Sequence, residues 1–360
     1  MDWFATKLLA WHDAHGRHDL PWQHDPTPYR VWVSEIMLQQ TQVTTVIDYY
    51  LRFMQRFGNV EALAAAELDD VLHLWTGLGY YARARNLHKS ARIIVDDIST
   101  FPEGKLPDTQ DKLQELPGIG RSTAGAIIAI AHEKRATILD GNVKRVLTRF
   151  HNIAGYPGIS TVNKALWSAA DTHTPALRTR NYTQAIMDLG ATLCTRKDPY
   201  CDRCPLQSLC AAYEAGTVNV LPTPKPKKEK PVRRARFFVL AAPNGTALVE
   251  QKPTDGLWGG LWTPPQRPSD TTTEAFLHEF EMTRNEIKRE HIAPIFRHTF
   301  SHYHLDIEPV YLHLEKLPTM IRERDDVRWV SADQHGSNSP VGLSKPAVTL
   351  LESLREPFSA

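Results

Sequence analysis

The sequence lacks any apolar run long enough to cross a bilayer as a helix, since its longest, at residues 124–131, is much too short. Residues 1–15 mix charged and aromatic side chains and do not follow the pattern of a secretory signal peptide. These two absences predict a cytoplasmic protein with no membrane attachment.

The net charge is also low, at +1 over 360 residues. A chain this close to neutral does not surround itself with a field that attracts nucleic acid, so phosphates would have to be bound by local basic patches and backbone N–H groups. The length favours two ordinary hydrophobic cores over a single large one.

Cysteine is absent except in one short segment, residues 194–210, which holds all four. A disulfide framework would be spread through a small secreted domain, whereas crowded thiols indicate a metal site. Six, two and five residues separate Cys194, Cys201, Cys204 and Cys210. Four thiolates on short loops suit either a [4Fe–4S] cluster or tetrahedral zinc.

The distribution of apolar residues predicts two domains of different class. Residues 1–216 read as mainly α-helical, including one helix over residues 29–50 that Thr27 caps and Pro28 begins. Residues 217–236 form a linker rich in proline and basic residues, and residues 237–357 alternate as strands with two helical patches, which indicates an α+β module. Further helices are expected near residues 68–74, 83–97, 111–115, 122–132, 141–150, 162–172 and 181–189.

A glycine-rich turn joins two of the predicted helices at residues 116–125. Gly118 and Gly120 permit a tight turn and leave successive N–H groups exposed at the next helix start, which is a site for a phosphate. The alternative is an ordinary turn between helices. The neighbouring motifs favour a helix-hairpin-helix DNA anchor.

Two acidic residues form a candidate catalytic pair. Asp140 stands where a helix N-cap belongs, and the positive potential of a helix start favours its ionised form. Glu35 lies among Trp32, Ile36 and Met37, and poor hydration there favours its protonated form. The alternatives are a simple cap for Asp140 and a surface position for Glu35.

An acid and an anion in one site suit the hydrolysis of an N-glycosidic bond. The leaving base needs a proton on a ring nitrogen, and the remaining sugar develops oxocarbenium character. Glu35 would donate the proton, and Asp140 would stabilise or trap the cation.

These motifs together closely resemble the A/G-specific adenine DNA glycosylases, the MutY family of the endonuclease III superfamily. The resemblance covers nearly the whole chain, through residues 20–22, 34–43, 74–86, 116–125, 139–143, 194–210, 256–262 and 296–302. It implies a helix-hairpin-helix six-helix domain with an iron–sulfur segment, followed by a Nudix-like domain. It also implies that the cysteines bind a [4Fe–4S] cluster.

The resemblance further assigns roles to single residues. Glu35 would be the general acid and Asp140 the ion-stabilising carboxylate, with Asn142 and Ser122 in the catalytic set. The residues that would contact DNA are Gln40, Thr41, Leu78, Tyr80, Gly118, Gly120, Phe300, Ser301 and His302. Without the resemblance, Tyr80 would read as a core aromatic, and strand alternation would put Ser301 on one face with Tyr303 and Leu305.

The C-terminal module lacks the helix of paired glutamates that binds metal in Nudix hydrolases, so it is expected to bind and not to hydrolyse. Ser301 would read the altered edge of 8-oxoguanine. His298, His302 and His304 form a solvated face in preference to a metal site.

The resulting hypothesis is a monomeric glycosylase that removes adenine opposite 8-oxoguanine or guanine in double-stranded DNA. The alternative is a bifunctional glycosylase–lyase acting on oxidised pyrimidines, as in the endonuclease III branch. That branch carries a lysine where this chain has Ser122, which favours the monofunctional reading. Lys144 leaves weak lyase activity open. A Nudix nucleotide hydrolase and a non-catalytic iron–sulfur DNA-binding protein are further alternatives.

Overall fold

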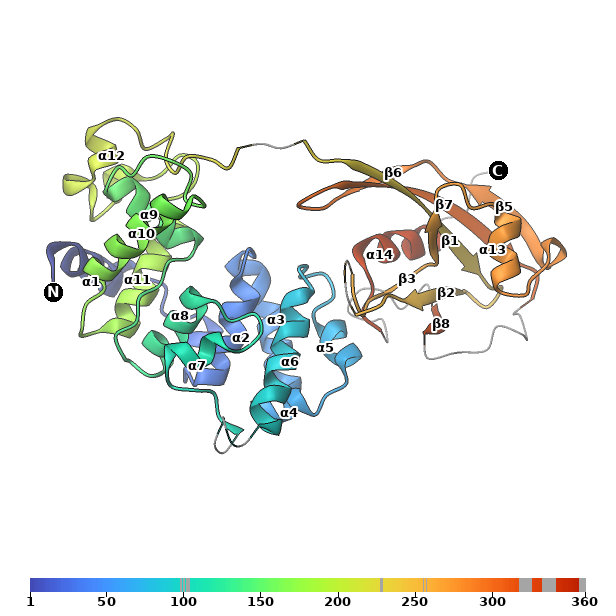
Figure 1. The fold of residues 1–360 in the computed structure, drawn as a ribbon, viewed down its shortest axis with the longest axis horizontal. Coiled ribbons are helices and arrows are strands. Elements are labelled where there is room, and N and C mark those ends of the chain that lie inside the picture. Colours follow the sequence, from blue (N-terminus) through green and yellow to red (C-terminus); the bar gives the residue numbers. More distant parts are fainter. Residues whose placement is uncertain are drawn as a thin grey trace. The chain divides into compact units, whose positions relative to one another are not determined.

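The computed structural model describes residues 1–97, 99, 101, 104–226, 229–254, 256, 258–316, 326–331 and 341–355. The chain divides into two compact units (Figure 1). Unit 1 contains Met1–Ala65 and Asn86–Lys227, and unit 2 contains Ala66–Arg85 and Lys228–Ala360. Residues 66–85, which the sequence analysis gave to the helical domain, therefore belong to the unit that contains the sheet.

Unit 1 is built from helices joined by short turns. They are α1 (Trp3–His15), α2 (Pro28–Leu38), α3 (Val43–Arg56), α4 (Val60–Ala64), α6 (Ala82–Asp96, its first turn in unit 2), α7 (Gln110–Gln114), α8 (Arg121–Ala131), α9 (Gly141–Phe150), α10 (Ser160–His173), α11 (Thr179–Thr192) and α12 (Ala211–Glu214). α1, α4 and α12 were not predicted from the sequence. The class, a helical domain followed by an α+β domain, was.

The single helix expected over residues 29–50 is wrong, because two helices occupy this stretch. Thr27 caps α2 as expected, its side chain accepting from Arg30 N, but α2 ends at Leu38 and α3 begins at Val43. Gln40, between them, has a φ of +57°, a left-handed conformation that no α-helix can contain. Apolar residues on both sides of the turn keep the helical spacing, which hid the break.

Helix α8 lies at the centre of unit 1. All its residues from Ala124 to Ile130 are buried, and it packs against α2, α7 and α11. Gly125 permits a close approach to the buried stretch that leads to Asp140, because a Cβ there would lie 2.4 Å from Thr137 O. Both α2 and the segment before α9 therefore pack against α8.

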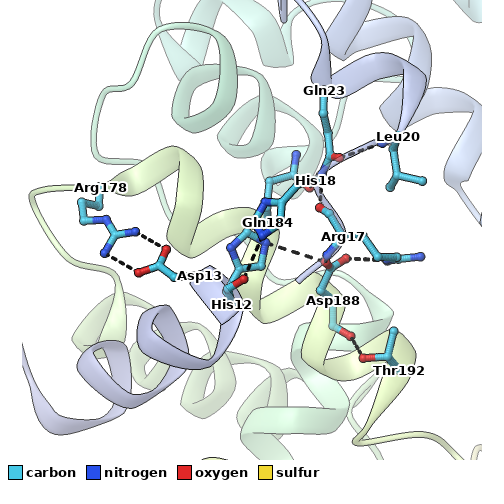
Figure 2. A network of polar contacts seen from close by, with 10 residues as sticks. All are labelled: His12, Asp13, Arg17, His18, Leu20, Gln23, Arg178, Gln184, Asp188 and Thr192. Atoms are coloured by element: carbon cyan, nitrogen blue, oxygen red, sulfur yellow. Dashed lines mark hydrogen bonds and ion pairs between the residues drawn. The ribbon is translucent and has the colours of Figure 1, made fainter. Parts of the chain in front are cut away.

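A polar network attaches the N-terminal segment to α11 (Figure 2). Asp188 of α11 is 1% exposed and accepts hydrogen bonds from the backbone N–H of Arg17 at 2.8 Å and from its Nε at 2.9 Å. Gln23 donates to Arg17 O at 2.9 Å, and Arg178 pairs with Asp13 of α1. These bonds fix α11, which packs against both α8 and α9.

The sheet of unit 2 has the strand order β3-β2-β1-β7-β5, with β4 paired to β1, β6 to β7 and β8 to β2. β1 and β7 are parallel, from Val232 opposite His304 to Ala241 opposite His313, and the other pairs are antiparallel. The strands are β1 (Val232–Ala241), β2 (Thr246–Gln251), β3 (Trp262–Thr263), β4 (Gln266–Pro268), β5 (Ile287–Ile292), β6 (Phe296–Thr299), β7 (His304–Leu314) and β8 (Val327–Ser331).

Helices cover the two faces of this sheet. Side chains alternate along β1, so Phe237 and Val239 pack with Leu350 of α14 (Lys345–Glu352), whereas Phe238 packs with Phe276 of α13 (Thr273–Glu279). Both faces are therefore apolar, which explains the unbroken hydrophobic run in β1. β1, β2, β7 and the two helices appear where the sequence predicted strands and helical patches, whereas β3, β4, β5, β6 and β8 were not predicted.

The expected linker, residues 217–236, is partly structured at both ends. Leu221 is buried and its carbonyl accepts from Arg149 Nε at 2.9 Å, which ties that end to unit 1. At the other end β1 begins at Val232, so basic residues assigned to a tether, such as Arg234 and Arg236, lie in a strand. The basic residues hid the start of the strand, because its first three residues are exposed and lack an apolar pattern.

Helix α5 (Leu68–Leu74) and the turn after it lie in unit 2. Val71 and Leu72 are fully buried, and Leu72 lies against Gly260 and Gly342. No helix in the described part of the chain is long and apolar enough to cross a membrane.

We predict that Gly125→Ala destabilises unit 1 by about 1–3 kcal/mol, because the added methyl group would overlap backbone atoms that cannot move independently. Gly58→Ala is the matched control, since its nearest neighbour lies at an ordinary 3.5 Å. Urea unfolding of both variants gives the comparison. Equal midpoints would contradict the close approach of α8 to residue 137.

Candidate active site and DNA-contacting residues

Glu35 lies near the end of α2 in an apolar environment. Its neighbours Trp32, Ile36 and Met37 are buried, while Glu35 itself stays partly accessible to solvent. Burial, and secondly the negative charge of Asp140, raise the pKa of Glu35 to about 8. A carboxyl group with this pKa keeps its proton at neutral pH, as its apolar neighbours suggested.

Asp140 is the N-cap of α9. Its Oδ1 accepts from Val143 N at 2.8 Å, and its Oδ2 accepts from Asn142 Nδ2 at 3.3 Å. Burial raises the pKa of Asp140 more than the donors at Val143 and Asn142 and the charge of Arg145 lower it. The expectation that a helix start alone would hold this pKa down is therefore wrong, because desolvation is the larger effect.

The charge of Asp140 acts on Glu35. Since the charge of Asp140 is a cause of the raised pKa of Glu35, the two groups share one poorly hydrated environment. Two such carboxyls do not both ionise readily. Asp140 has hydrogen-bond donors that stabilise its anion, so the proton of the pair resides on Glu35.

Contacts at the start of α8 bring this pair together. The Ser122 hydroxyl accepts from Leu139 N at 2.9 Å, which holds the residue next to Asp140. Gln39, directly after α2, donates to the adjacent Thr123 hydroxyl at 3.4 Å. The end of α2 and the start of α9 are thus both attached to the first turn of α8.

The turn at residues 116–120 has the expected glycine-dependent geometry. Gly118 has a φ of +83°, and a Cβ on it would lie 2.9 Å from Asn86 Cβ. Gly120 is the N-cap of α8, and both glycines are exposed while Ile119 between them is buried. Their N–H groups lie at the N-terminus of an 11-residue helix, where the helix dipole favours an anion.

Gln40 and Thr41 occupy the turn between α2 and α3. Gln40 is exposed in the left-handed conformation already described, and Thr41 donates to Gln39 O at 3.3 Å. A non-glycine residue in this region is strained and usually marks a turn or a functional site. Gln40 follows Glu35 by five positions on the same continuous segment.

In unit 2, Leu78 and Tyr80 lie on the turn after α5. Leu78 is buried, whereas Tyr80 is 55% exposed and has a φ of +51°. Tyr80 is therefore no core aromatic. Gly77 and Gly79 also have positive φ, and the Arg83 guanidinium lies 5.5 Å from the Tyr80 ring centre.

Phe300, Ser301 and His302 lie between β6 and β7. The Phe300 ring packs on Trp258, with ring centres 5.2 Å apart, and its carbonyl accepts from Lys230 Nζ at 2.8 Å. Ser301 and His302 are exposed, with Ser301 Oγ 3.2 Å from His302 Nδ1. Placement of Ser301 on a strand face beside Tyr303 is therefore wrong, because β7 begins only at His304.

The four cysteines line one cavity that is partly open to solvent, together with Arg149, Gln207 and mainly apolar side chains. Burial raises the pKa of Cys204 to about 12, and burial also raises the pKa values of Cys201 and Cys210. Among the described residues, no group of three or more His, Cys, Asp or Glu side chains is placed so that it could hold a metal ion.

Two arginines of α9 were missed in the sequence. Arg145 Nη2 donates to Asn142 Oδ1 at 2.9 Å, and its Nε donates to Cys194 O at 2.6 Å. Arg149, 2% exposed, donates to Cys194 Sγ at 3.3 Å and to Thr195 O at 2.7 Å. Arginines four residues apart on one helix face were the available signal. They link Asp140, through Asn142, to the cysteine segment.

Comparison with known proteins finds matches for both parts of the chain. The family model for HhH-GPD superfamily base excision DNA repair proteins matches residues 33–171, and that for NUDIX domains matches residues 236–353. An adenine DNA glycosylase of Buchnera aphidicola subsp. Schizaphis graminum is 37% identical, covering 97% of this chain and 98% of that protein. One from Mus musculus is 34% identical, covering 98% of this chain and 78% of that protein.

The chain belongs to the adenine DNA glycosylase family. The resemblance seen in its motifs is thus confirmed, and the protein is a DNA N-glycosylase of base-excision repair. A solved structure of a thermostable thymine-DNA glycosylase is also similar, with a TM-score of 0.53 and 28% identity, covering 59% of this chain and 95% of that one.

For this glycosylase we predict that Glu35→Gln raises the free energy of unfolding at pH 8 but changes it little at pH 5. The folded-state pKa of about 8 exceeds the ordinary 4.5, so the wild type binds this proton more tightly when folded. Its contribution to stability is present below pH 4.5 and is lost as pH rises towards 8, at about 1.4 kcal/mol per pKa unit at most.

Denaturant unfolding of wild type and Glu35→Gln across this pH range measures the difference. Glu115→Gln, which changes an exposed glutamate of unit 1, is the control and should show no such trend. A gap between wild type and Glu35→Gln that does not widen with pH would contradict a protonated Glu35 in a poorly hydrated environment.

Proposed function

We propose that this glycosylase removes adenine paired with 8-oxoguanine, or with guanine, from double-stranded DNA. The observation that carries the proposal is the coupled pair formed by a protonated Glu35 and a hydrogen-bonded Asp140. The relatives are adenine DNA glycosylases, which supports the choice of base.

In the proposed mechanism, Glu35 donates its proton to a ring nitrogen of adenine as the bond from the base to the sugar breaks. Protonation makes the base a better leaving group, and positive charge develops on the sugar. The Asp140 carboxylate stabilises that charge, and water then completes the hydrolysis. Asn142 orients Asp140, and Ser122 holds the backbone before it.

The adenine must leave the duplex before it can reach these groups. We assign the exposed Gln40 and Tyr80 to the gap in the base stack and Thr41 and Leu78 to the neighbourhood of the opposite base. Strained, exposed conformations at Gln40 and Tyr80 support this assignment. The N–H groups at Gly118 and Gly120 would bind a backbone phosphate.

Recognition of 8-oxoguanine is assigned to Phe300, Ser301 and His302 of the Nudix-like domain. Oxidation turns N7 of guanine into a donor and adds a carbonyl at C8, and the exposed Ser301 hydroxyl can bond either group. Phe300 is held by Trp258 and Lys230, which gives the turn a defined shape.

Ser122 supports a monofunctional reaction. Its hydroxyl is already engaged by Leu139 N, and it carries no amine that could form a Schiff base with the sugar. The bifunctional alternative on oxidised pyrimidines depends on such an amine. Lys144, close to Asp140 in sequence, leaves room for weak lyase activity. The cytoplasmic location and the monomeric state stay predictions.

We propose that Cys194, Cys201, Cys204 and Cys210 hold a [4Fe–4S] cluster. In a [4Fe–4S] cluster each of four cysteine thiolates binds a different iron, and the four cysteines that line one cavity supply that number. The Arg149 guanidinium beside Cys194 Sγ would offset the negative charge of the thiolates. The cluster would order residues 194–210.

The proposed mechanism predicts that Glu35→Gln and Asp140→Asn each lower the single-turnover rate of adenine release by roughly a thousandfold or more. Both should still bind the duplex containing adenine opposite 8-oxoguanine. Alkali cleavage reveals abasic sites, and gel shift measures binding. Excision at the wild-type rate by Glu35→Gln would refute its role as the acid. Stoichiometric borohydride trapping of the wild type, with oxidised pyrimidine as the better substrate, would establish the bifunctional alternative.

The cysteine assignment predicts four irons and four sulfides per chain, with a broad visible absorption band that zinc cannot give. Cys204→Ser should lower the iron content and unfold at lower temperature, because it removes a thiol from the cavity lining. Ser208→Ala, in the same segment and exposed, is the control. One zinc and no iron in protein purified without air would overturn the assignment.

A further inference from the structure

Unit 2 draws its candidate DNA-contacting residues from two distant parts of the chain. Leu78 and Tyr80 come from residues 66–85, and Ser301 comes from residues 228–360. Rigid placement of both groups requires contacts that fasten the first stretch to the sheet.

Asp69 of α5 makes the main polar contact of this kind. Its Oδ1 accepts from Gln251 Nε2 of β2 at 2.8 Å, and its Oδ2 accepts from Trp262 Nε1 of β3 at 3.3 Å. Gln251 and Trp262 are paired neighbours in the sheet, so one carboxylate bridges two strands. Arg328 of β8 lies 4.0 Å from the same carboxylate and 4.7 Å from the Trp262 ring centre.

Apolar packing accompanies this bridge. Leu72 is fully buried. A Cβ added to Gly260, or one added to Gly342, would lie 3.0 Å from a Leu72 side-chain atom. The absence of side chains at both glycines lets α5 lie directly on the backbone of unit 2.

The far end of the turn is fastened as well. Arg85 Nη1 donates to Gly259 O at 2.9 Å, and the Tyr81 hydroxyl donates to Leu343 O at 3.4 Å. Leu78 and Tyr80 therefore lie on a turn that is tied to the sheet domain both before it, at Asp69, and after it, at Tyr81 and Arg85.

Residues 258–262 connect this turn to the one that carries Ser301. Trp258 packs on Phe300, Gly259 accepts from Arg85, and Trp262 donates to Asp69. A displacement of α5 would therefore be transmitted through a five-residue segment to the neighbourhood of Ser301.

We propose that Asp69 is a positioning residue for recognition of the base opposite adenine. Its carboxylate fixes α5 and the following turn on the sheet, so that the turn carrying the buried Leu78 and the exposed Tyr80 is held in the same compact unit as Ser301. This inference rests on the proposed function, because it takes the DNA-contacting roles of these three residues from there.

The test compares four full-length variants: Asp69→Ala, Asp69→Asn, Gln251→Met and Glu67→Gln. Asp69→Ala removes both acceptor atoms, and Asp69→Asn keeps one. Gln251→Met removes one donor at similar side-chain length. Glu67→Gln removes an exposed charge at the start of the same helix, where the side chain makes no capping bond, and is the control.

The first measurement is hydrogen–deuterium exchange without DNA. Asp69→Ala should raise exchange in peptides covering residues 68–81, with smaller increases for Asp69→Asn and Gln251→Met and none for Glu67→Gln. Peptides from α8 and α9 in unit 1 should be unchanged. Exchange at residues 68–81 equal to that of wild type in Asp69→Ala would overturn the anchor.

The second measurement is single-turnover adenine excision opposite 8-oxoguanine and opposite guanine, with Ser301→Ala as benchmark. Asp69→Ala should lower the ratio of the two rates by roughly tenfold, a size set by the loss of a charged hydrogen-bonded contact. Asp69→Asn and Gln251→Met should lower it less. Mere destabilisation would slow both substrates equally, and an unchanged ratio would overturn the positioning role.

The two hypotheses fail in different ways. A wild-type protein that releases no adenine opposite 8-oxoguanine refutes the proposed function, and the exchange data alone then decide whether Asp69 anchors α5. A wild type that discriminates normally, beside an Asp69→Ala protein that does so equally well, refutes only the positioning role.

Discussion

A carboxylic acid that stays protonated near neutral pH, beside a second buried carboxyl group that accepts backbone and amide hydrogen bonds, is the interaction on which the rest of this site depends. The pKa values of Glu35 and Asp140 are shifted by their surroundings, since a free carboxyl group of either type has a pKa of about 4. The difference arises because apolar side chains surround Glu35, while backbone and amide donors reach Asp140. The fold must therefore keep two helices, α2 and α9, in a fixed relation.

The buried helix α8 provides that relation. Its apolar surface packs against α2 and α11, its glycine lets the segment before α9 approach, and its first turn is hydrogen-bonded to both neighbours. The hydrogen bonds from Arg17 to Asp188 then attach α11 to the segment after α1. The precision of the site is thus a property of the packing of unit 1.

The sequence predicted what depends on local chemistry. The cap at Thr27, the glycine turn, the strands β1, β2 and β7 and the apolar environment of Glu35 all follow from residue type and spacing. It failed where distant segments decide the outcome. The break at Gln40 interrupts no hydrophobic pattern, the desolvation of Asp140 comes from elements that are distant in sequence, and the partners of Arg145 and Arg149 lie some fifty residues further along the chain. The contact of Leu72 with Gly342 cannot be seen in the sequence around either residue, because the two are far apart along the chain.

Unit 2 combines residues 66–85 with residues 228–360, so removing the C-terminal part also affects the N-terminal part. A chain cut in the linker would retain α5 but lose the strands and glycine backbone that lie against it, so side chains such as Leu72, now fully buried, would face water. Each such side chain loses about 1.5–3 kcal/mol on exposure. The shortened protein would carry an adhesive apolar surface beside Tyr80, and it would be prone to self-association in addition to lacking its second domain.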